Sequence, residues 1–459
     1  MSDTSPQLKA AQPVLESHRL SAGVLLAYGS LSFPLAAAFI TLQVMVPTYY
    51  AETIGLSLSA TGLVLLLARL WDMFTDPVVG FFSDRTPPRW GKRRFWVILA
   101  GPTIAISVWF LFNPPLNAGP VYLLVWTLAI YVAGTMSIVP MNAWGAELTP
   151  DYGERSRVTA FRAAFGIGGT LIALLIAALA SLNEAATMTD ALTWISLLIV
   201  ASLIVSTLWA IIRVPDSGNS VLPDNTFIDA LRLLRRPTPF RTLLISFLLN
   251  NVGNAIPATL FILYVVHVLD ARDAAGPLLF LYFCFAAISV PLWLALANRF
   301  GKHRAWIMAV LLACASFVWT PLLGPESFYI FVAIVAVTGF ATSADLILPS
   351  AIMGDLIEWD SLENGYQRPG LFFALWGTVT KLGFALAIGL SFPVLELAGF
   401  SATEVNTPDE ILLLAMIYGG PCILFKLWAV LLMRNYPINQ AEHKRIRVAL
   451  SESLQPGQS

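Results

Sequence analysis

Long apolar runs alternate with short polar segments along most of the chain. A helix that crosses a bilayer needs about 20 mostly apolar residues, and twelve runs reach that length. The short alternating segments of a membrane β-barrel do not occur. We therefore expect an all-α membrane protein with twelve transmembrane helices. The runs cover residues 22–50, 57–82, 95–113, 120–143, 158–182, 191–213, 240–269, 276–297, 304–323, 327–357, 370–399 and 409–433.

Composition supports this interpretation and excludes several classes of protein. Of the 459 residues, 57% are hydrophobic and 12% are charged, whereas a soluble protein carries about 25% charged residues. A net charge of −1 gives no sign of nucleic-acid binding. Cys284, Cys314 and Cys422 lie in apolar runs without CxxC spacing, so no disulfide framework or thiolate metal site is implied. No nucleophile–base pair or metal-ligand cluster is evident, so we expect neither an enzyme nor a cofactor.

The loops on one side of the predicted membrane carry mainly basic residues, and those on the other side carry mainly acidic ones. The loops that follow even-numbered runs are the basic ones, rich in Lys and Arg. Because loops rich in Lys and Arg stay in the cytoplasm, we expect both termini there. The protein is expected in the cytoplasmic (inner) membrane of a bacterium, as a monomer.

The chain also repeats itself. Residues 84–96, between the second and third runs, resemble residues 298–306, between the eighth and ninth. Two six-helix halves related in this way are the pattern of the major facilitator fold. We expect a tail, two halves with a linker between them, and a second tail. Their ranges are 1–21, 22–213, 214–239, 240–434 and 435–459.

Ionisable residues inside the apolar runs are candidate functional residues, because inserting each at the centre of a span costs roughly 2.5–3.5 kcal/mol of free energy. Asp72 and Asp76 are four residues apart, so both lie on one helix face with Thr75 beside them. This stripe suits a small hard cation or a proton. Alternatively, Arg69 pairs with Asp72 and locks the bundle. Lys381 lies close to mid-depth in its run and is expected to approach the two carboxylates.

Other polar residues are candidates for solute binding. Asp345 near mid-span 10 is a solute ligand or an acceptor for neighbouring hydroxyls or Lys381. Asn251 and Asn254 share a face of span 7, as solute ligands or as interhelical hydrogen bonds. Asn142 and Trp144 end span 4, where Trp144 is an interface anchor or a sugar platform. Trp376 completes the set. The expected cytoplasmic gate consists of Asp84, Arg85, Arg93, Glu147, Glu154, Asp355 and Glu358.

These segments together resemble the glycoside–pentoside–hexuronide:cation symporters, the melibiose permease branch of the major facilitator superfamily, from about residue 22 to 434. The resemblance implies that Asp72, Thr75 and Asp76 bind the coupling ion with Thr135, that Lys381 contacts them, and that Arg162 belongs to the sugar region or its gate. The matching motifs are Arg69-Leu70-Trp71-Asp72 with Asp76-Pro77, residues 89–96, residues 140–151 with 154–155 and 161–162, and residues 370–373 with 380–382.

Two departures from this family concern the solute. Ala36 and Ile138 stand where the melibiose permease has aspartates in its first and fourth spans. Their absence argues against α-galactoside transport by the same chemistry. The missing span 4 acid weakens the case for sodium and strengthens the case for a proton. A more apolar pocket would also suit an amphiphile or an aromatic glycoside.

We therefore expect a secondary active transporter that couples H⁺ or Na⁺ to the symport of a sugar, glycoside or sugar acid by alternating access. Its partners are a small-molecule solute and the lipid bilayer. The alternative is a cation-coupled lysolipid or amphiphile carrier on the same fold, since the animal sodium-dependent lysolipid transporters share the span 2 and span 11 motifs. A remote alternative is a non-transporting membrane receptor or scaffold.

Overall fold

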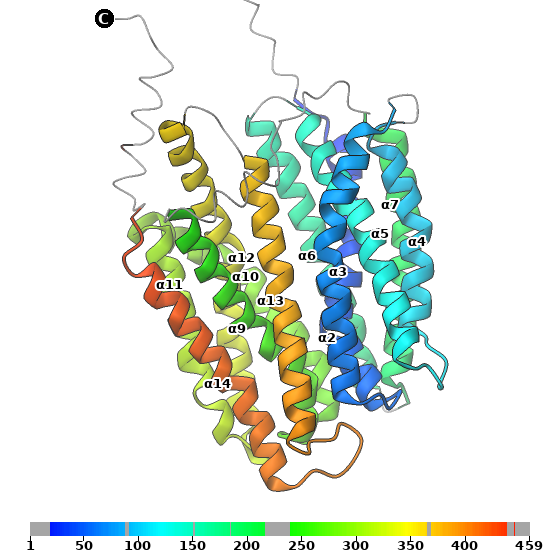
Figure 1. Cartoon of the computed structure of the whole chain (residues 1–459), viewed down its shortest axis with the longest axis vertical. Coiled ribbons are helices and arrows are strands. Elements are labelled where there is room, and N and C mark those ends of the chain that lie inside the picture. Colours follow the sequence, from blue (N-terminus) through cyan, green and yellow to red (C-terminus); the bar gives the residue numbers. More distant parts are fainter. Residues whose placement is uncertain are drawn as a thin grey trace, which may run out of the picture.

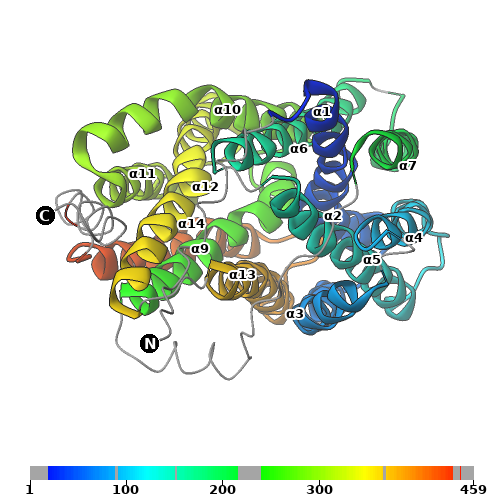
Figure 2. The same cartoon turned by 90° about the horizontal axis from the view of Figure 1, so that it is seen from above.

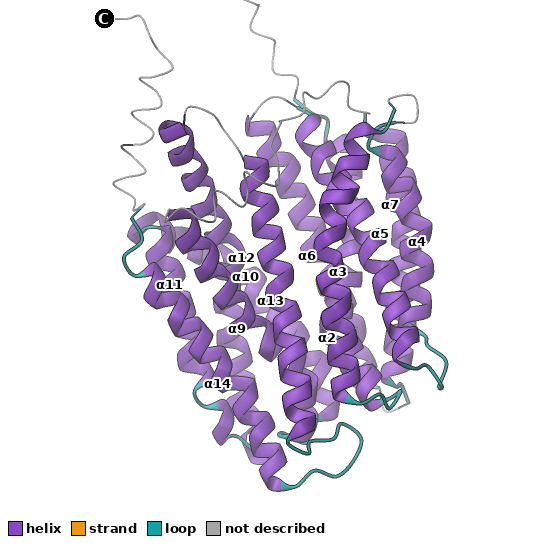
Figure 3. Cartoon of the chain, viewed as in Figure 1, coloured by secondary structure: helices purple, strands orange, loops and turns teal. Residues whose placement is uncertain are grey.

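The computed structural model describes residues 19–87, 91–149, 152–183, 185–215, 239–364, 369–437 and 445. Across these ranges the regular structure is helical (Figure 3). It contains twelve helical spans long and apolar enough to cross a membrane, as the hydropathy pattern predicts. The expected linker and both expected tails fall largely outside the described residues.

Seven helices build the N-terminal half (Figure 1). The first two form one span, which is interrupted at Leu31. The helices are α1 (Ala22–Ser30), α2 (Ser32–Glu52), α3 (Leu58–Arg85), α4 (Arg94–Phe112), α5 (Pro120–Glu147), α6 (Tyr152–Ser181) and α7 (Met188–Arg213).

The C-terminal half contains six long helices and three short 3-10 turns. The turns are η2 (Arg272–Ala274), η3 (Thr320–Leu322) and η4 (Pro325–Ser327). The long helices are α9 (Pro239–His267), α10 (Ala275–Phe300), α11 (Lys302–Phe317), α12 (Phe328–Asn364), α13 (Pro369–Leu397) and α14 (Pro408–Met433).

Local sequence explains where several spans begin. The side chain of Thr187 accepts from the Asp190 amide and the Asp190 carboxylate accepts from the Thr187 amide, a capping box that starts α7. Thr407 and Glu410 form the same arrangement at α14. These caps satisfy backbone N–H groups that the first turn of a helix leaves without partners.

The two halves lie side by side and meet along three helix pairs, α3 with α13, α6 with α10, and α2 with α9 (Figure 2). Glycine allows the closest approaches. A Cβ on Gly62 would lie 2.9 Å from Cβ of Phe392 and 3.1 Å from the Ile388 carbonyl oxygen. A Cβ on Gly276 would lie 2.6 Å from the Ala177 carbonyl oxygen. Both glycines are near the starts of their helices, so the halves touch closely at that face.

Polar contacts join the halves at the same face, which carries the acidic loops and is here called the acidic face. Glu52 at the end of α2 lies 3.1 Å from Arg272 and 3.5 Å from His267. The Ser59 amide donates to Glu396 of α13 at 2.5 Å. The opposite face, with the basic α3–α4 and α10–α11 junctions, is called the basic face.

Helix ends differ from the predicted run ends at several places, and two of them concern candidate gate residues. α12 continues to Asn364 and α6 starts at Tyr152, whereas the apolar runs end at 357 and start at 158. Hydropathy marks the apolar core of the bilayer, and a helix can extend past it into water. The additional turns carry Glu358 and Glu154, two of the candidate gate residues.

Candidate functional site

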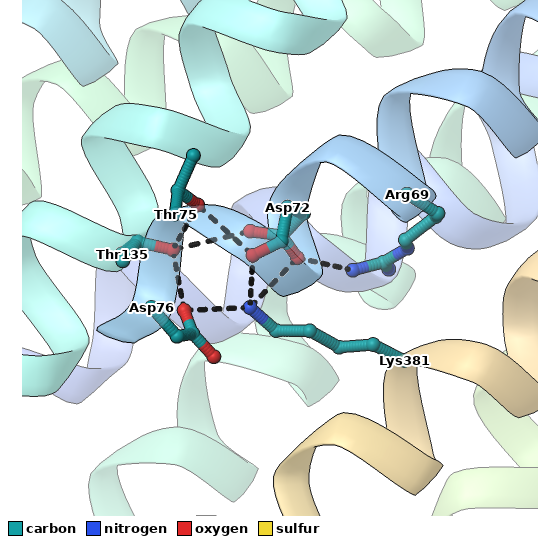
Figure 4. Close-up of polar contacts among 6 residues, drawn as sticks. All are labelled: Arg69, Asp72, Thr75, Asp76, Thr135 and Lys381. Carbon is teal, nitrogen blue, oxygen red and sulfur yellow. Dashed lines mark hydrogen bonds and ion pairs between the residues drawn. The ribbon is translucent and has the colours of Figure 1, made fainter. Parts of the chain in front are cut away.

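A cluster of opposite charges joins the two halves inside the helix bundle (Figure 4). Asp72 and Asp76 project from one face of α3 toward Lys381 of α13. The Lys381 ammonium lies 2.9 Å from Oδ2 of Asp72 and 2.8 Å from Oδ1 of Asp76. The Asp72 side chain is 3% exposed and that of Asp76 is 31% exposed. The structure thus brings Lys381 together with the two carboxylates that it was expected to approach.

Two threonines add hydroxyl oxygens to the cluster. Thr135 of α5 donates to either carboxylate, with Oγ1 3.1 Å from Oδ1 of Asp72 and 2.8 Å from Oδ1 of Asp76. Thr75 donates to the Asp72 carbonyl at 2.9 Å and lies 3.5 Å from Thr135. Carboxylate and hydroxyl oxygens are ligands that a hard cation prefers. The same carboxylates could instead accept a proton.

Arg69 borders the cluster as a second cation. Its guanidinium lies 3.5 Å from Asp72 and 4.4 Å from the centroid of the Tyr131 ring. The longer separation makes this ion pair weaker than the one with Lys381. Arg69 stacks on an aromatic face, which stabilises a cation that has left water. The Arg69–Asp72 pair of the alternative interpretation is therefore present, together with the Lys381 contacts.

A cavity of about 450 Å³ adjoins this cluster, mainly among the helices of the C-terminal half. Four candidate solute-binding residues line it: Asn251, Asn254, Asp345 and Trp376. The Trp376 ring stacks on Phe247, with centroids 3.5 Å apart and planes 17° apart. The volume is within the range of small-molecule sites. Most of the remaining wall is aliphatic or aromatic, including Ile40, Val44, Phe261, Phe283, Phe317, Ile334 and Phe384.

A second ion pair lies in the wall of this cavity, and sequence reasoning missed half of it. Asp345 pairs with Lys426 of α14 at 3.3 Å, not with Lys381 as one alternative had it. Lys426 is 1% exposed and also donates to Asn250 at 3.0 Å. The available signal was a lysine inside the last apolar run, seven positions before the end of that run at 433, where a long side chain can also reach the interface.

Three candidate solute ligands do not line the cavity. Trp144 is fully buried, and its indole N–H donates to the Pro215 carbonyl at 2.8 Å. The predictions that it anchors at the interface or stacks on a sugar were therefore wrong, because packing encloses the ring. Arg162 of α6 donates to Asn142 of α5, which holds both side chains at the neighbouring helix pair.

Several candidate gate residues form ion pairs within their own half. Arg93 contacts Glu147 at 2.7 Å and donates to Ser83 at 2.7 Å. Asp355 pairs with Lys302 at 2.6 Å.

Other gate candidates lie near helix ends at the basic face. Arg157 and the Leu20 amide donate to Glu154 and hold the pKa of its carboxyl below the usual range. The Arg85 guanidinium lies over the Phe81 ring, and Glu358 is half-buried on α12. The side chain of Asp84 lies outside the described part of the structure.

Two six-helix halves around a charged centre and a cavity define a major facilitator transporter. The family described as MFS/sugar transport protein matches residues 27–440, and the chain belongs to it. The protein is therefore an integral membrane symporter that moves a small-molecule solute, and it is not an enzyme. The resemblance that the motifs carried is confirmed at the level of the family.

Curated relatives differ in what they carry. The sodium-dependent lysophosphatidylcholine symporter 1 of Gallus gallus is 22% identical, over 95% of this chain and 90% of the relative. The glucuronide carrier protein homolog of Escherichia coli is 23% identical, over 88% of this chain and 90% of the relative. Among solved structures, the nucleoside transporter NupG aligns with a TM-score of 0.66 at 13% identity, over 90% of this chain and 99% of that chain.

Proposed function

We propose that the protein couples the inward movement of H⁺ or Na⁺ to symport of an organic solute by alternating access. The coupling ion binds at Asp72, Asp76 and Thr135, with Thr75 beside them. The observation that carries the proposal is the position of Lys381. Its ammonium occupies the space between two carboxylates of the opposite half, so a cation of the protein already fills the place of the coupling ion.

Competition for the same oxygens supplies a coupling mechanism. Lys381 belongs to α13 and the carboxylates to α3, so their ion pairs cross the boundary between the halves. A bound Na⁺, or a proton on one carboxylate, weakens these pairs. The strength with which these ion pairs hold the two halves together then depends on whether the ion site is occupied. A ligand can shift a conformational equilibrium only through such a difference in affinity for the two states.

The cavity beside the ion site is the proposed solute site. A sugar, glycoside or sugar acid fits its combination of polar and aromatic groups, and one relative is named for a glucuronide. A lysolipid or other amphiphile is the second candidate. It is favoured by the largely apolar lining and by relatives named for lysophosphatidylcholine. A glycoside with an aromatic aglycone and a lysolipid both join a polar head to a bulky apolar part.

The basic face is proposed to lie in the cytoplasm, with both termini. Lys and Arg close to the ends of spans bias a membrane protein toward this orientation. In this arrangement the acidic face is extracellular, and contacts of Glu52 and Glu396 hold it closed.

Uptake into proteoliposomes tests the coupling. Purified protein takes up radiolabelled solutes from a panel of sugars, aryl glycosides, uronates and lysolipids under an imposed Na⁺ gradient, an imposed pH gradient, or neither. We expect accumulation with one gradient. Asp76→Asn should abolish the effect of the gradient, because the variant carboxamide carries no charge to hold the ion.

The matched control is Asp409→Asn, an equal change at an exposed position in the first turn of α14. It should retain gradient-driven uptake. Gradient-driven uptake by Asp76→Asn at the wild-type rate would contradict the assignment of the ion site.

A further inference from the structure

The Asp345 carboxylate is fixed by donors from three other helices. Trp306 of α11 donates to Oδ1 at 2.6 Å. Asn254 of α9 and Lys426 of α14 donate to Oδ2 at 3.0 Å and 3.3 Å. An ionised carboxylate has roughly four acceptor positions. Three are used by these partners, so Oδ1 retains acceptor capacity.

Lys426 is more deeply enclosed than this carboxylate. Both residues line the cavity, but the side chain of Asp345 is 8% exposed and that of Lys426 is 1% exposed. A solute therefore meets the carboxylate before the ammonium. Lys426 balances the charge of the Asp345 carboxylate, so the empty cavity needs no cation from the solute.

We propose that Asp345 accepts hydrogen bonds from the hydroxyls of an uncharged glycoside, and that Lys426 acts through it as a positioning residue. This rests on the proposed function, in which the cavity binds the solute. A solute anion would meet a carboxylate first and be repelled. A solute cation would add a positive charge that the neutral pair does not balance. A neutral hydroxyl donor avoids both costs.

The stacked rings of Trp376 and Phe247 supply the apolar part of the same site. Aromatic surfaces pack well against an aglycone ring or the carbon face of a sugar. Thr342 of α12 also lines the cavity, one turn before Asp345. A head with hydroxyls and a flat apolar group can then be held at both ends.

Binding of two matched probes to the detergent-purified full chain tests the proposal, in Na⁺ and in choline buffers at two pH values. The probes are 4-nitrophenyl glucoside and 4-nitrophenyl glucuronide, which share an aglycone and differ only at C6, a hydroxymethyl group in the first and a carboxylate in the second. Wild type should bind the glucoside at least about tenfold more tightly. Asp345→Asn should weaken glucoside binding by about ten- to a hundredfold, the effect of losing hydrogen bonds to a charged acceptor.

Variants of Lys426 separate positioning from folding. Lys426→Met alone leaves a buried carboxylate without its counter-charge, which can destabilise the fold. The double variant with Asp345→Asn removes both charges and should regain thermal stability without regaining glucoside affinity. A purely structural role would weaken both probes equally, whereas a positioning role lowers the ratio of glucoside to glucuronide affinity. Asp409→Asn should keep the wild-type ratio.

Two results would overturn the proposal: a glucoside that binds no more tightly than the glucuronide, or a stable double variant that binds glucoside like wild type. The coupling assignment fails separately. Normal gradient-driven uptake by Asp76→Asn would refute the ion site. It would leave the glucoside preference, which is measured on wild type and the Asp345 variants, unaffected.

Discussion

Lys381 is the residue whose neighbours decide how the ion site behaves. Two carboxylates of another helix share its ammonium, and Arg69 is held at a longer distance by only one of them. Because Asp72 is deeply buried, its charge requires a nearby counter-charge in the empty state. Lys381 supplies it, so its removal should make stability depend on the coupling ion.

We predict that Lys381→Met lowers the stability of the ion-free protein by about 2 kcal/mol, below the usual range for buried pairs because Asp76 is partly exposed. Na⁺ should restore more stability in the variant than in wild type, or acidification should if the ion is a proton. Melting temperatures in detergent, with Na⁺ titrated against choline and pH varied, measure both effects.

Lys302→Met is the control, because it removes an ion pair at the end of α11 rather than at the centre. It should show the wild-type response to Na⁺ and to pH. Equal responses in Lys381→Met and wild type would show that the lysine and the coupling ion do not share a site.

Sequence reasoning was effective for residues whose position is set by helix periodicity. The four-residue spacing of Asp72 and Asp76 fixes their common face, and the depth of Lys381 matches theirs. It failed where several helices determine the outcome. Burial of Trp144 depends on how neighbouring elements pack, and the partner of Asp345 is set by α14 rather than by its own helix.

At the scale of elements, α3 and α13 form the main boundary between the halves. Gly62 allows α3 to lie against Ile388 and Phe392 near the acidic face. Lys381 joins the same two helices farther along. One helix pair therefore carries both a close contact that closes one face and the proposed ion site, so their states should be linked.

Gly62→Val should separate α3 from α13 at the acidic face, because its Cβ alone would meet atoms 2.9–3.1 Å away. We expect a larger population open at that face. Spin labels at Thr53 and Ala398, in a variant without the native cysteines, should report longer distances. Gly420→Val is the helical control, since a Cβ there meets nothing within 4 Å. Unchanged distances in Gly62→Val would argue against this boundary as a gate.

Hydropathy predicted that the twelve transmembrane helices exist, but it did not predict all the residues at which they begin and end. All twelve spans occur in the described part of the chain. The extra turns of α6 and α12 are polar, so no apolar run could reveal them. The break at Leu31 inside the first span was also not predicted, although Ser30 and Ser32 flank it in an otherwise apolar run.

At the scale of the whole molecule, ion pairs at the acidic face hold the two halves together. Arg272→Glu would place a like charge beside Glu52, so we predict a several-fold larger open population. The effect should be modest, about 1 kcal/mol or less, because Arg272 is 65% exposed and water screens the pair. The same spin labels measure it, and Glu52→Arg combined with Arg272→Glu should restore the closed state. No change at low salt would show that the pair does not hold this face.

The pairing of charges inside the spans has an electrical consequence. Arg69, Lys381, Asp72 and Asp76 sum to zero, as do Asp345 and Lys426. In the proposed cycle the empty carrier reorients without electrical work, while the carrier loaded with one cation and a neutral solute gains about 2.3 kcal/mol per 100 mV. A K⁺ diffusion voltage, negative inside, should accelerate net uptake and leave the return of the empty carrier unaffected. The membrane potential then drives only the step in which the carrier reorients with ion and solute bound.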